Sequence, residues 1–341
     1  MNVLVAMSGG VDSSVAAALL RAAGHDVTGV TLRLWGGDTD SGCCSVSDVE
    51  DARRVAAQLD IPHYVFNLAD DFEAAVVEPY VEAHAAGRTP NSCVECNRSI
   101  KFGVLLDRAH ALGFDAIATG HHARVSQAPG GRYRLLRGAD RAKDQSYVLY
   151  MLGQSALRRA LLPIGHLTKV EVRAHAAHLG LRTADKSESM DVCFVRREDR
   201  RRFVSERVGS VRGLVVDAAG SVLARHDGIE GFTVGQRRGL GVAVGEPRYV
   251  VDVDAGTATV TIGSRRDLLC DHVDVRDLTW VDAVPSPGTP LLVQTRAHGN
   301  PARGELGEGV VRFDEPARRV APGQVVALYD GDALLGGGIA A

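Results

Sequence analysis

Apolar residues follow two spacings in the first half of the chain, and their alternation predicts a sheet of parallel strands. Short apolar runs of strand length are separated by stretches in which apolar residues recur every three or four positions, as in helices. Such alternation is typical of an α/β domain with helices on both faces of a parallel sheet, which binds ligands at the carboxyl ends of its strands. The strand-like runs span 2–6, 27–35, 63–68 and 115–120, and the helix-like stretches span 11–23, 48–59, 70–86 and 100–112.

The pattern changes after about residue 200, where short β-type runs are broken by Gly and Asp. Repeated short strands of this kind are typical of small barrels or sheets. The runs span 213–228, 248–263, 291–299 and 325–338. We therefore predict an N-terminal α/β domain over residues 1–194, a central β-rich domain over 195–263 and a C-terminal β domain over 264–341.

Length and charge narrow the class of protein. The 341 residues exceed what one core usually organises. The net charge of −3 gives no overall basic field, although a local basic face can still bind nucleic acid. No apolar run approaches the ~20 residues of a membrane span. The first residues read as a core strand and not as a secretion signal. We expect a cytoplasmic protein with no membrane partner.

The segment Ser-Gly-Gly-Val-Asp-Ser-Ser, residues 8–14, joins the first predicted strand to the first predicted helix. A Gly-rich turn before a helix N-terminus presents backbone N–H groups and a positive dipole to an anion. Asp12 is unusual beside phosphates unless it holds or orients Mg²⁺. By composition alone the segment also fits a tight turn between two core elements. Its residue order resembles the PP-loop of ATP pyrophosphatases, which cut ATP to AMP and pyrophosphate while adenylating a substrate oxygen.

The six cysteines indicate reactive, buried or metal-binding thiols, because a reducing compartment disfavours a disulfide framework. Cys93 and Cys96 form a Cys-x-x-Cys motif just before a predicted helix. A helix N-terminus and nearby cations lower a thiol pKa. For Cys270 and for the adjacent pair 43–44, a buried small side chain is the simpler interpretation.

Cys193 lies about a hundred residues after this motif. No second Cys-x-x-Cys or His-x-x-x-His motif completes a zinc site with Cys93 and Cys96. For Cys93, Cys96 and Cys193 two interpretations stay open: covalent sulfur chemistry, or a three-thiolate iron–sulfur cluster.

Seven motifs occur in a fixed order along the chain, and together they resemble the tRNA-specific 2-thiouridylases from residue 2 to residue 339. The resemblance implies an ATP pyrophosphatase domain, similar to the adenine nucleotide α hydrolases, then a small central β domain and a C-terminal β-barrel. The motifs are MSGGVDSS, GRTPN..C..CN..IKF, ATGHHAR, LLRGADRAKDQSYVLY, VCF, TVGQRRGLG and PGQ.

The resemblance also implies a reaction, that of a tRNA-uridine 2-sulfurtransferase. ATP with Mg²⁺ would adenylate the C2 oxygen of the wobble uridine of tRNA. Sulfur from a cysteine persulfide would then give 2-thiouridine, AMP and pyrophosphate. The persulfide would come from a cysteine desulfurase or a relay protein. The alternatives are a thiolase with a [4Fe–4S] cluster on Cys93, Cys96 and Cys193 that uses free sulfide, and a PP-loop ligase for a small molecule.

Residue roles follow from the same resemblance. Cys96 matches the nucleophile and Cys193 the persulfide carrier, and the two would form a transient disulfide. The target base would contact Asn91, Ser92 and Cys93. The ATP positions are Ala6, Met7, Ser8, Gly9, Gly10, Val11, Asp12, Ser13, Leu32 and Gly120. Further tRNA positions are His121, Lys143, Asp144, Gln145, Arg296, Ala297 and Gln324.

Two of these positions depart from the family pattern. Family members often carry Pro-Asp where this chain has Ser92-Cys93, so any role of that Asp is vacant here or passes to a thiol. At 296–297 the chain has Arg-Ala, without the aromatic that would stack on a base.

Basic runs at 196–202 and 237–238 are candidates for phosphate contacts. His121 follows a predicted strand end and is a candidate general acid or a core histidine.

Overall fold

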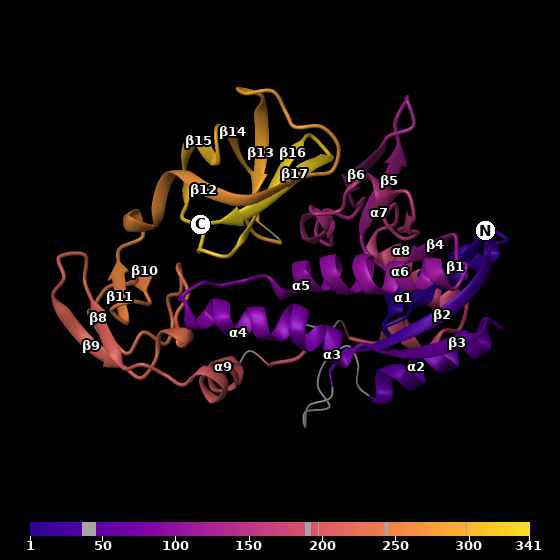
Figure 1. Ribbon diagram of the computed structural model, residues 1–341, viewed down its shortest axis with the longest axis horizontal. Coiled ribbons are helices and arrows are strands. Elements are labelled where there is room, and N and C mark those ends of the chain that lie inside the picture. Colours follow the sequence, from indigo (N-terminus) through magenta and orange to yellow (C-terminus); the bar gives the residue numbers. More distant parts are fainter. Residues whose placement is uncertain (36–45, 188–191, 197, 243–244, 298) are drawn as a thin grey trace.

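The computed structural model describes residues 1–35, 46–187, 192–196, 198–242, 245–297 and 299–341. The pair Cys43–Cys44 and Arg197 lie outside these residues. The chain forms an N-terminal α/β domain, a small central sheet and a C-terminal barrel (Figure 1). The fold class expected from the sequence is thereby confirmed.

The N-terminal sheet has five parallel strands in the order β3-β2-β1-β4-β7. Four of them match predicted strands within two residues at each end. The fifth, β7, has two residues and was not predicted. The strands are β1 (Asn2–Ala6), β2 (Asp26–Arg33), β3 (His63–Asn67), β4 (Ala116–Ala118) and β7 (Ala160–Leu161).

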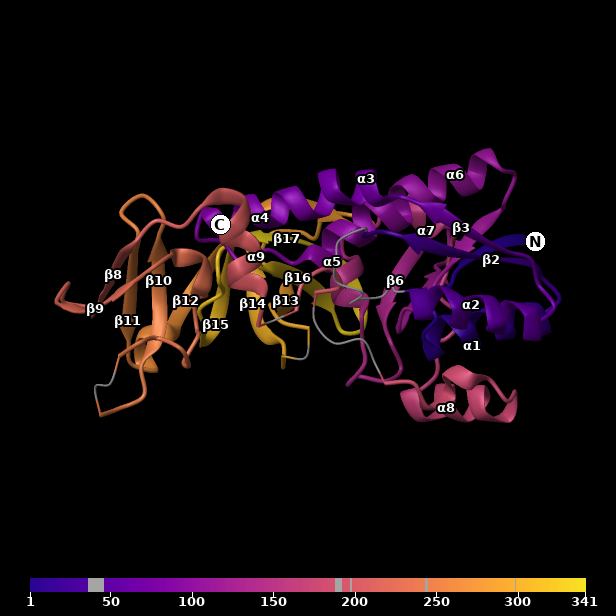
Figure 2. The ribbon, with the colours of Figure 1, turned by 90° about the horizontal axis from the view of Figure 1, so that it is seen from below.

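Helices cover both faces of this sheet, as Figure 2 shows. One face packs against α1 (Val11–Ala22), α2 (Val46–Gln58) and α8 (Lys169–His178). The alternation of side chains along β1 explains the two layers, because successive residues of a strand point to opposite faces. Val3 and Val5 are buried with α1, whereas Leu4 is buried on the other face with Phe72 and Ile100.

The second face is covered by two long helices, each containing a π-helical segment. The first runs through α3 (Ala69–Phe72), η1 (Glu73–Val77) and α4 (Glu78–Ala85). The second runs through α5 (Ser92–Glu95), η2 (Cys96–Val104) and α6 (Leu105–Ala111). The sequence-based start at residue 100 was wrong, because the Asn91 side chain caps the helix by accepting a hydrogen bond from the Cys93 N–H at 3.1 Å.

The C-terminal barrel is a six-stranded antiparallel sheet that closes through pairing of its first and last strands, β12 and β17. A hairpin of the N-terminal domain, β5 (Ala123–Gln127) and β6 (Tyr133–Arg137), extends this sheet by pairing β6 with β17. This hairpin was not predicted. The barrel strands are β12 (Leu269–Trp280), β13 (Pro290–Gln294), β14 (Ala302–Leu306), β15 (Val310–Arg318), β16 (Val325–Asp330) and β17 (Ala333–Ala340).

The central domain has four strands in the order β10-β11-β8-β9, preceded by the helix α9 (Arg200–Val208). No helix in the described ranges is long and apolar enough to cross a membrane. The strands are β8 (Gly213–Val216), β9 (Val222–His226), β10 (Tyr249–Asp254) and β11 (Thr259–Gly263). Short helices complete the chain: η3 (Ser146–Leu149), α7 (Gln154–Leu157), η4 (Arg182–Asp185), η5 (Ile229–Gly231) and η6 (Arg266–Leu268).

A buried histidine of α4 makes the fold sensitive to acid. His84 is 2% exposed, and its ring lies edge-on to Tyr80 with the centroids 4.5 Å apart. Burial, and then the charge of Arg200 on α9, lower the pKa of His84 to about 4. In the unfolded chain the His84 imidazole therefore binds a proton near pH 6.5, whereas in the folded chain it does so only near pH 4.

We expect the free energy of unfolding to fall between pH 6.5 and 4, with His84 contributing about 3 kcal/mol of that loss. In His84→Gln the neutral amide has no proton to gain, so the decline should be shallower over the same interval. Urea unfolding at pH 7, 6, 5 and 4 measures it, with the exposed His110→Gln as the control. Parallel declines in wild type and His84→Gln would assign the acid sensitivity to other groups.

Candidate active site

One cavity lies at the carboxyl ends of β1, β2 and β4, the edge at which an open parallel sheet binds its ligands. Its volume is about 830 Å³. The N-terminal domain forms most of the wall, and the barrel adds Ala297 and Gln324. Most residues expected to hold ATP or RNA therefore meet in one place. Those that line the cavity are Ala6, Met7, Ser8, Gly10, Val11, Asp12, Ser13, Leu32, Asn91, Ser92, Cys93, Gly120, His121, Lys143, Asp144, Gln145, Ala297 and Gln324.

The loop before α1 has the geometry of an anion site. Gly10 is the N-cap of α1, and the Ser13 and Ser14 hydroxyls donate to its carbonyl oxygen at 3.2 and 2.8 Å. The N–H groups of the first turn lack partners within the helix, and they carry the positive end of its dipole. Gly120 approaches so closely that a Cβ there would lie 2.6 Å from the Ser13 nitrogen. The loop can thus present its N–H groups to a phosphate.

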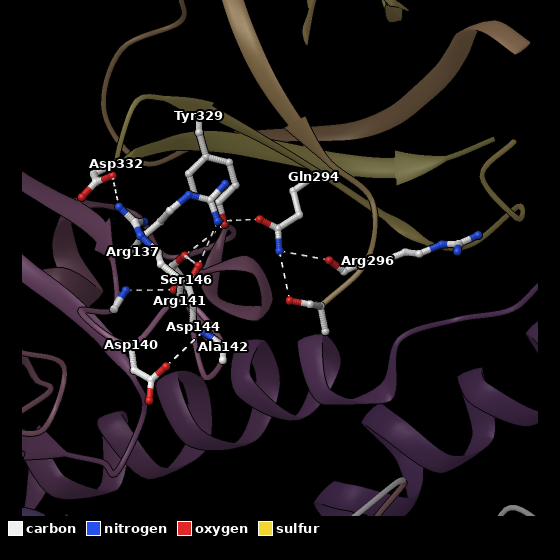
Figure 3. Close-up of polar contacts among 12 residues, drawn as sticks. Arg137, Asp140, Arg141, Ala142, Asp144, Ser146, Gln294, Arg296, Tyr329 and Asp332 are labelled. Carbon is white, nitrogen blue, oxygen red and sulfur yellow. Dashed lines mark hydrogen bonds and ion pairs between the residues drawn. The ribbon is translucent and has the colours of Figure 1, made fainter. Parts of the chain in front are cut away.

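Four predicted site residues lie outside the lining. Gly9 has a φ of +71°, and a Cβ there would lie 2.3 Å from the Asp48 carbonyl oxygen, so the close approach of these two segments requires glycine. Arg296 points its side chain away from the neighbouring polar network (Figure 3). Cys96 and Cys193 belong to the core beneath the cavity.

Asp12, the carboxylate of the loop, is held by two partners from other elements. Lys169 Nζ lies 2.8 and 2.7 Å from its two oxygens, and His122 Nε2 lies 3.2 Å from Oδ1. Burial would raise the pKa of Asp12, but these two hydrogen bonds outweigh it and lower the pKa. From the sequence, an Asp beside phosphates was explained by a role in holding or orienting Mg²⁺. The structure supplies another, which is that Asp12 positions a lysine in the cavity wall.

Lys169 owes its position to the start of α8. Thr168 and Glu171 form a capping box, in which the Thr168 hydroxyl accepts from the Glu171 N–H and the Glu171 carboxylate accepts from the Thr168 N–H. The box fixes the first helical residue, Lys169, whose side chain is 10% exposed. A cation beside the α1 N-terminus adds to the positive field of the phosphate loop.

His121 is buried and neutral. Its Nδ1 lies 2.6 Å from the Thr119 hydroxyl. Burial, followed by the charges of Lys101 and His122, lowers the pKa of His121 well below its usual range. At neutral pH its imidazole therefore offers a neutral hydrogen bond to the cavity and is not a charged general acid.

The helix of the Cys-x-x-Cys motif faces the cavity at its beginning. Cys93 is exposed in the first turn of α5, and Cys96 is buried where the π-helical segment starts. Cys193 is half-buried and packs against the same core cluster, next to Val192 in the cavity wall. The two thiols assigned to sulfur transfer thus share one core, and Cys93 is the thiol that reaches the cavity.

The iron–sulfur alternative does not fit the described residues. Among them, no group of three or more His, Cys, Asp or Glu side chains is arranged to hold a metal ion. Cys93, Cys96 and Cys193 therefore do not form a cluster-binding set in this structure.

The motif Lys-Asp-Gln-Ser-Tyr, residues 143–147, holds the surrounding elements together. The Asp144 carboxylate, 4% exposed, accepts from Gly138 N, Ser146 N and Ser146 Oγ at 2.9 to 3.0 Å. Gln145 accepts from the His122 N–H at 2.9 Å, and Tyr147 is buried beside them in the cavity wall. Lys143, Asp144 and Gln145, the residues matched to tRNA contacts here, all line the cavity, but Asp144 and Gln145 are also hydrogen-bonded within the protein.

The basic runs differ in their surroundings. On α9, Arg201 pairs with Asp227 and Glu230, and Arg202 pairs with Asp199 and Glu206. These pairs offset much of the charge of that run. The segment 237–238 is exposed in the central domain.

Several functional side chains escaped sequence analysis. The capping box Thr-Lys-Val-Glu at 168–171 could have marked the helix that presents Lys169. No local signal indicates that Arg137 and Gln294, 157 residues apart, meet beneath the cavity wall. Lys186, which pairs with Asp48 and Asp51 at 2.7 and 2.6 Å, is likewise a cavity residue defined only by the fold.

Comparison with known proteins finds relatives of nearly equal length. The chain is 49% identical to the tRNA-specific 2-thiouridylase MnmA of Chloroflexus aurantiacus, over 99% of this chain and 97% of that protein. It is 51% identical to the MnmA of Mycolicibacterium paratuberculosis, over 98% of each. The chain belongs to the tRNA-specific 2-thiouridylase family.

The domain families matched along the chain agree with three parts. Residues 1–197 match the tRNA methyl transferase HUP domain, 201–264 the tRNA methyl transferase PRC-barrel domain and 270–340 the aminomethyltransferase beta-barrel domain. A solved 4-thiouridine synthetase–RNA complex with bound ATP is a distant match, at 19% identity over 56% of this chain and 44% of that one. Its TM-score of 0.38 is below the level at which a common fold follows.

Proposed function

We propose that the protein is a tRNA-uridine 2-sulfurtransferase that adenylates the wobble uridine of tRNA with ATP and replaces its C2 oxygen with sulfur. One observation carries the proposal. In a member of the 2-thiouridylase family, the phosphate loop, the helix of Cys93 and Cys96, and the barrel segment at Ala297 border a single cavity.

The phosphate loop would bind the ATP polyphosphate through the N–H groups at the start of α1. Lys169 beside it would stabilise the charge that develops as pyrophosphate leaves. Ala6, Met7 and Leu32 at the strand ends would contact the rest of the nucleotide. Mg²⁺ would enter with ATP and supply charge neutralisation, since no carboxylate set in the described chain fits a resident ion.

The target base would enter between Asn91–Cys93 and the barrel segment at Ala297. A base in a single-stranded anticodon loop leaves its stack at a cost of a few kcal/mol or less. Its C2 oxygen would form a bond to the α-phosphorus of ATP and release pyrophosphate. His121, being neutral, would serve this step by hydrogen bonding alone.

Sulfur would arrive as a persulfide on Cys193, made by a partner such as a cysteine desulfurase or a relay protein. In one route the terminal sulfur attacks C2, and the C2–O bond breaks to release AMP. Cys96 then attacks the Cys193 sulfur, forms the disulfide and leaves the sulfur on C2. In the other route Cys96 first frees hydrosulfide, which attacks C2. A dithiol reductant restores both thiols.

AMP formation from ATP, with and without unmodified tRNA carrying a wobble uridine, tests the proposal. We expect AMP only with that tRNA, and none with the same tRNA already thiolated. AMP that responds to a small acid or amine instead would indicate a ligase. Iron bound after oxygen-free purification, together with activity from sulfide alone, would favour the cluster-dependent route.

A further inference from the structure

Two of the contacts between the barrel and the N-terminal domain bear on the cavity. At the first, β17 pairs with β6, and Asp332 in the preceding turn pairs with Arg124 at 3.1 Å and with Arg141. At the second, Gln324 donates to the Thr89 carbonyl at 2.5 Å, two residues before Asn91. The barrel therefore forms a wall of the cavity and is not a separate appendage.

A buried polar network lies at the first contact (Figure 3). Arg137, the last residue of β6, donates from Nη1 to Asp144 at 2.9 Å and to the side-chain oxygen of Gln294 at 2.5 Å. Its guanidinium stacks on the Tyr329 ring, 3.5 Å from the centroid. The Tyr329 hydroxyl lies 3.0 Å from that of Ser146. One arginine thus joins the 143–147 motif to two barrel strands.

Gln294 links Arg137 to a turn in the cavity wall. Because its oxygen accepts from Arg137, its amide nitrogen is aimed at the following turn and donates to the carbonyls of Arg296 and Ala297 at 3.0 and 3.2 Å. Ala297 lines the cavity. The position of this turn thus depends on a bond that originates in the N-terminal domain.

The buried ion pair between Arg137 and Asp144 contributes more to a unique arrangement of the two domains than to the free energy of unfolding. The Arg137 and Asp144 side chains are 9% and 3% exposed, and a desolvated pair gains little net free energy over well-packed apolar residues. What it supplies is a single geometry, because a planar guanidinium must meet a carboxylate, an amide and a ring at once. Lysine keeps the charge but lacks the flat guanidinium that stacks on the Tyr329 ring.

We propose that Arg137 is a positioning residue, which sets the cavity-wall turn 295–297 against the 143–147 motif and so controls productive tRNA docking without contributing to ATP binding. The proposal rests on the proposed tRNA function for its kinetic effect, but its structural effect exists without substrate.

The test compares Arg137→Lys with Arg124→Lys. Both arginines lie at the same domain contact, but Arg124 pairs with the half-exposed Asp332 and with the backbone carbonyl of Arg137, whereas the side-chain bond to Gln294 comes from Arg137. We expect Arg137→Lys to raise the KM for tRNA about tenfold, with the KM for ATP within twofold of wild type. Arg124→Lys should leave both values near wild type. Equal increases in both KM values, or none, would overturn the proposal.

Hydrogen exchange without tRNA separates this idea from the proposed function. Backbone amides of 294–297 should exchange faster in Arg137→Lys than in wild type or Arg124→Lys, whatever reaction the enzyme performs. Gln294→Ala should reproduce that increase, and adding Arg137→Lys to it should change little more, because the two act in series. Unchanged exchange in Arg137→Lys would disprove the coupling even if tRNA thiolation is established.

Discussion

Replacing Cys193 by Ser should abolish thiolation, by roughly 10³-fold or more, while tRNA-dependent AMP formation continues. Ser cannot carry a persulfide, whereas the phosphate loop and Lys169 do not depend on that side chain. Cys193 packs against the core cluster that contains Cys96, next to the wall residue Val192. The isosteric change should therefore leave the adenylation site in place.

Cys96→Ser should lose thiolation to a similar extent but should still accept a persulfide, which mass spectrometry detects as one extra sulfur on Cys193. Cys270→Ser is the matched control, because Cys270 is a half-buried thiol of β12 whose Sγ donates to the Ala317 carbonyl at 3.6 Å. Cys93→Ser decides between the sulfur routes. Near-normal thiolation fits the persulfide route, and a loss equal to the other two variants would require three thiols acting as a set.

Features formed by contiguous residues could be predicted from the sequence, because their causes lie within a few positions of one another. The alternation of apolar spacings found the four main strands of the N-terminal sheet and four of the helices that cover it, but not α8. The Ser-Gly-Gly motif located the anion site because a strand, a turn and a helix N-terminus are contiguous. The helix start at Ser92 was missed although its cause, the Asn91 cap, is also local. There the apolar pattern begins later than the helix.

Long-range contacts explain most of what was missed. The β6–β17 pairing joins residues about 200 positions apart, and neither strand pattern specifies its partner. The same holds for Lys169, whose contact with Asp12 spans 157 positions. For Asp144 the sequence predicted a function but not the contacts of the side chain. The family resemblance placed it among tRNA contacts, but only the fold reveals that its carboxylate is buried and satisfied by Arg137, Gly138 and Ser146.

Lys169→Met should reduce tRNA-dependent AMP formation about 10²- to 10³-fold, the usual effect of removing one charge-stabilising group at a transition state. Two changes combine in this variant. The cation beside the phosphate loop is lost, and Asp12 keeps the longer contact with His122 at 3.2 Å, so its negative charge then opposes the incoming triphosphate. The affinity for tRNA measured without ATP should stay within about twofold. Lys186→Met, which removes another lysine of the cavity wall that pairs with carboxylates, is the matched control.

The pH profile distinguishes this role from a metal-binding role for Asp12. In wild type the hydrogen bonds from His122 and Lys169 lower the pKa of Asp12, so its carboxylate is charged throughout the working range. In Lys169→Met the burial that raises this pKa is no longer opposed by the hydrogen bond and charge of Lys169, so the acid limb of kcat/KM should move to higher pH. Asp12→Asn should keep part of the activity, because the amide oxygen can still accept a hydrogen bond from Lys169. Added Mg²⁺ should not restore the rest. Recovery of Asp12→Asn at high Mg²⁺, with an unmoved acid limb in Lys169→Met, would instead make Asp12 a ligand for the metal that accompanies ATP.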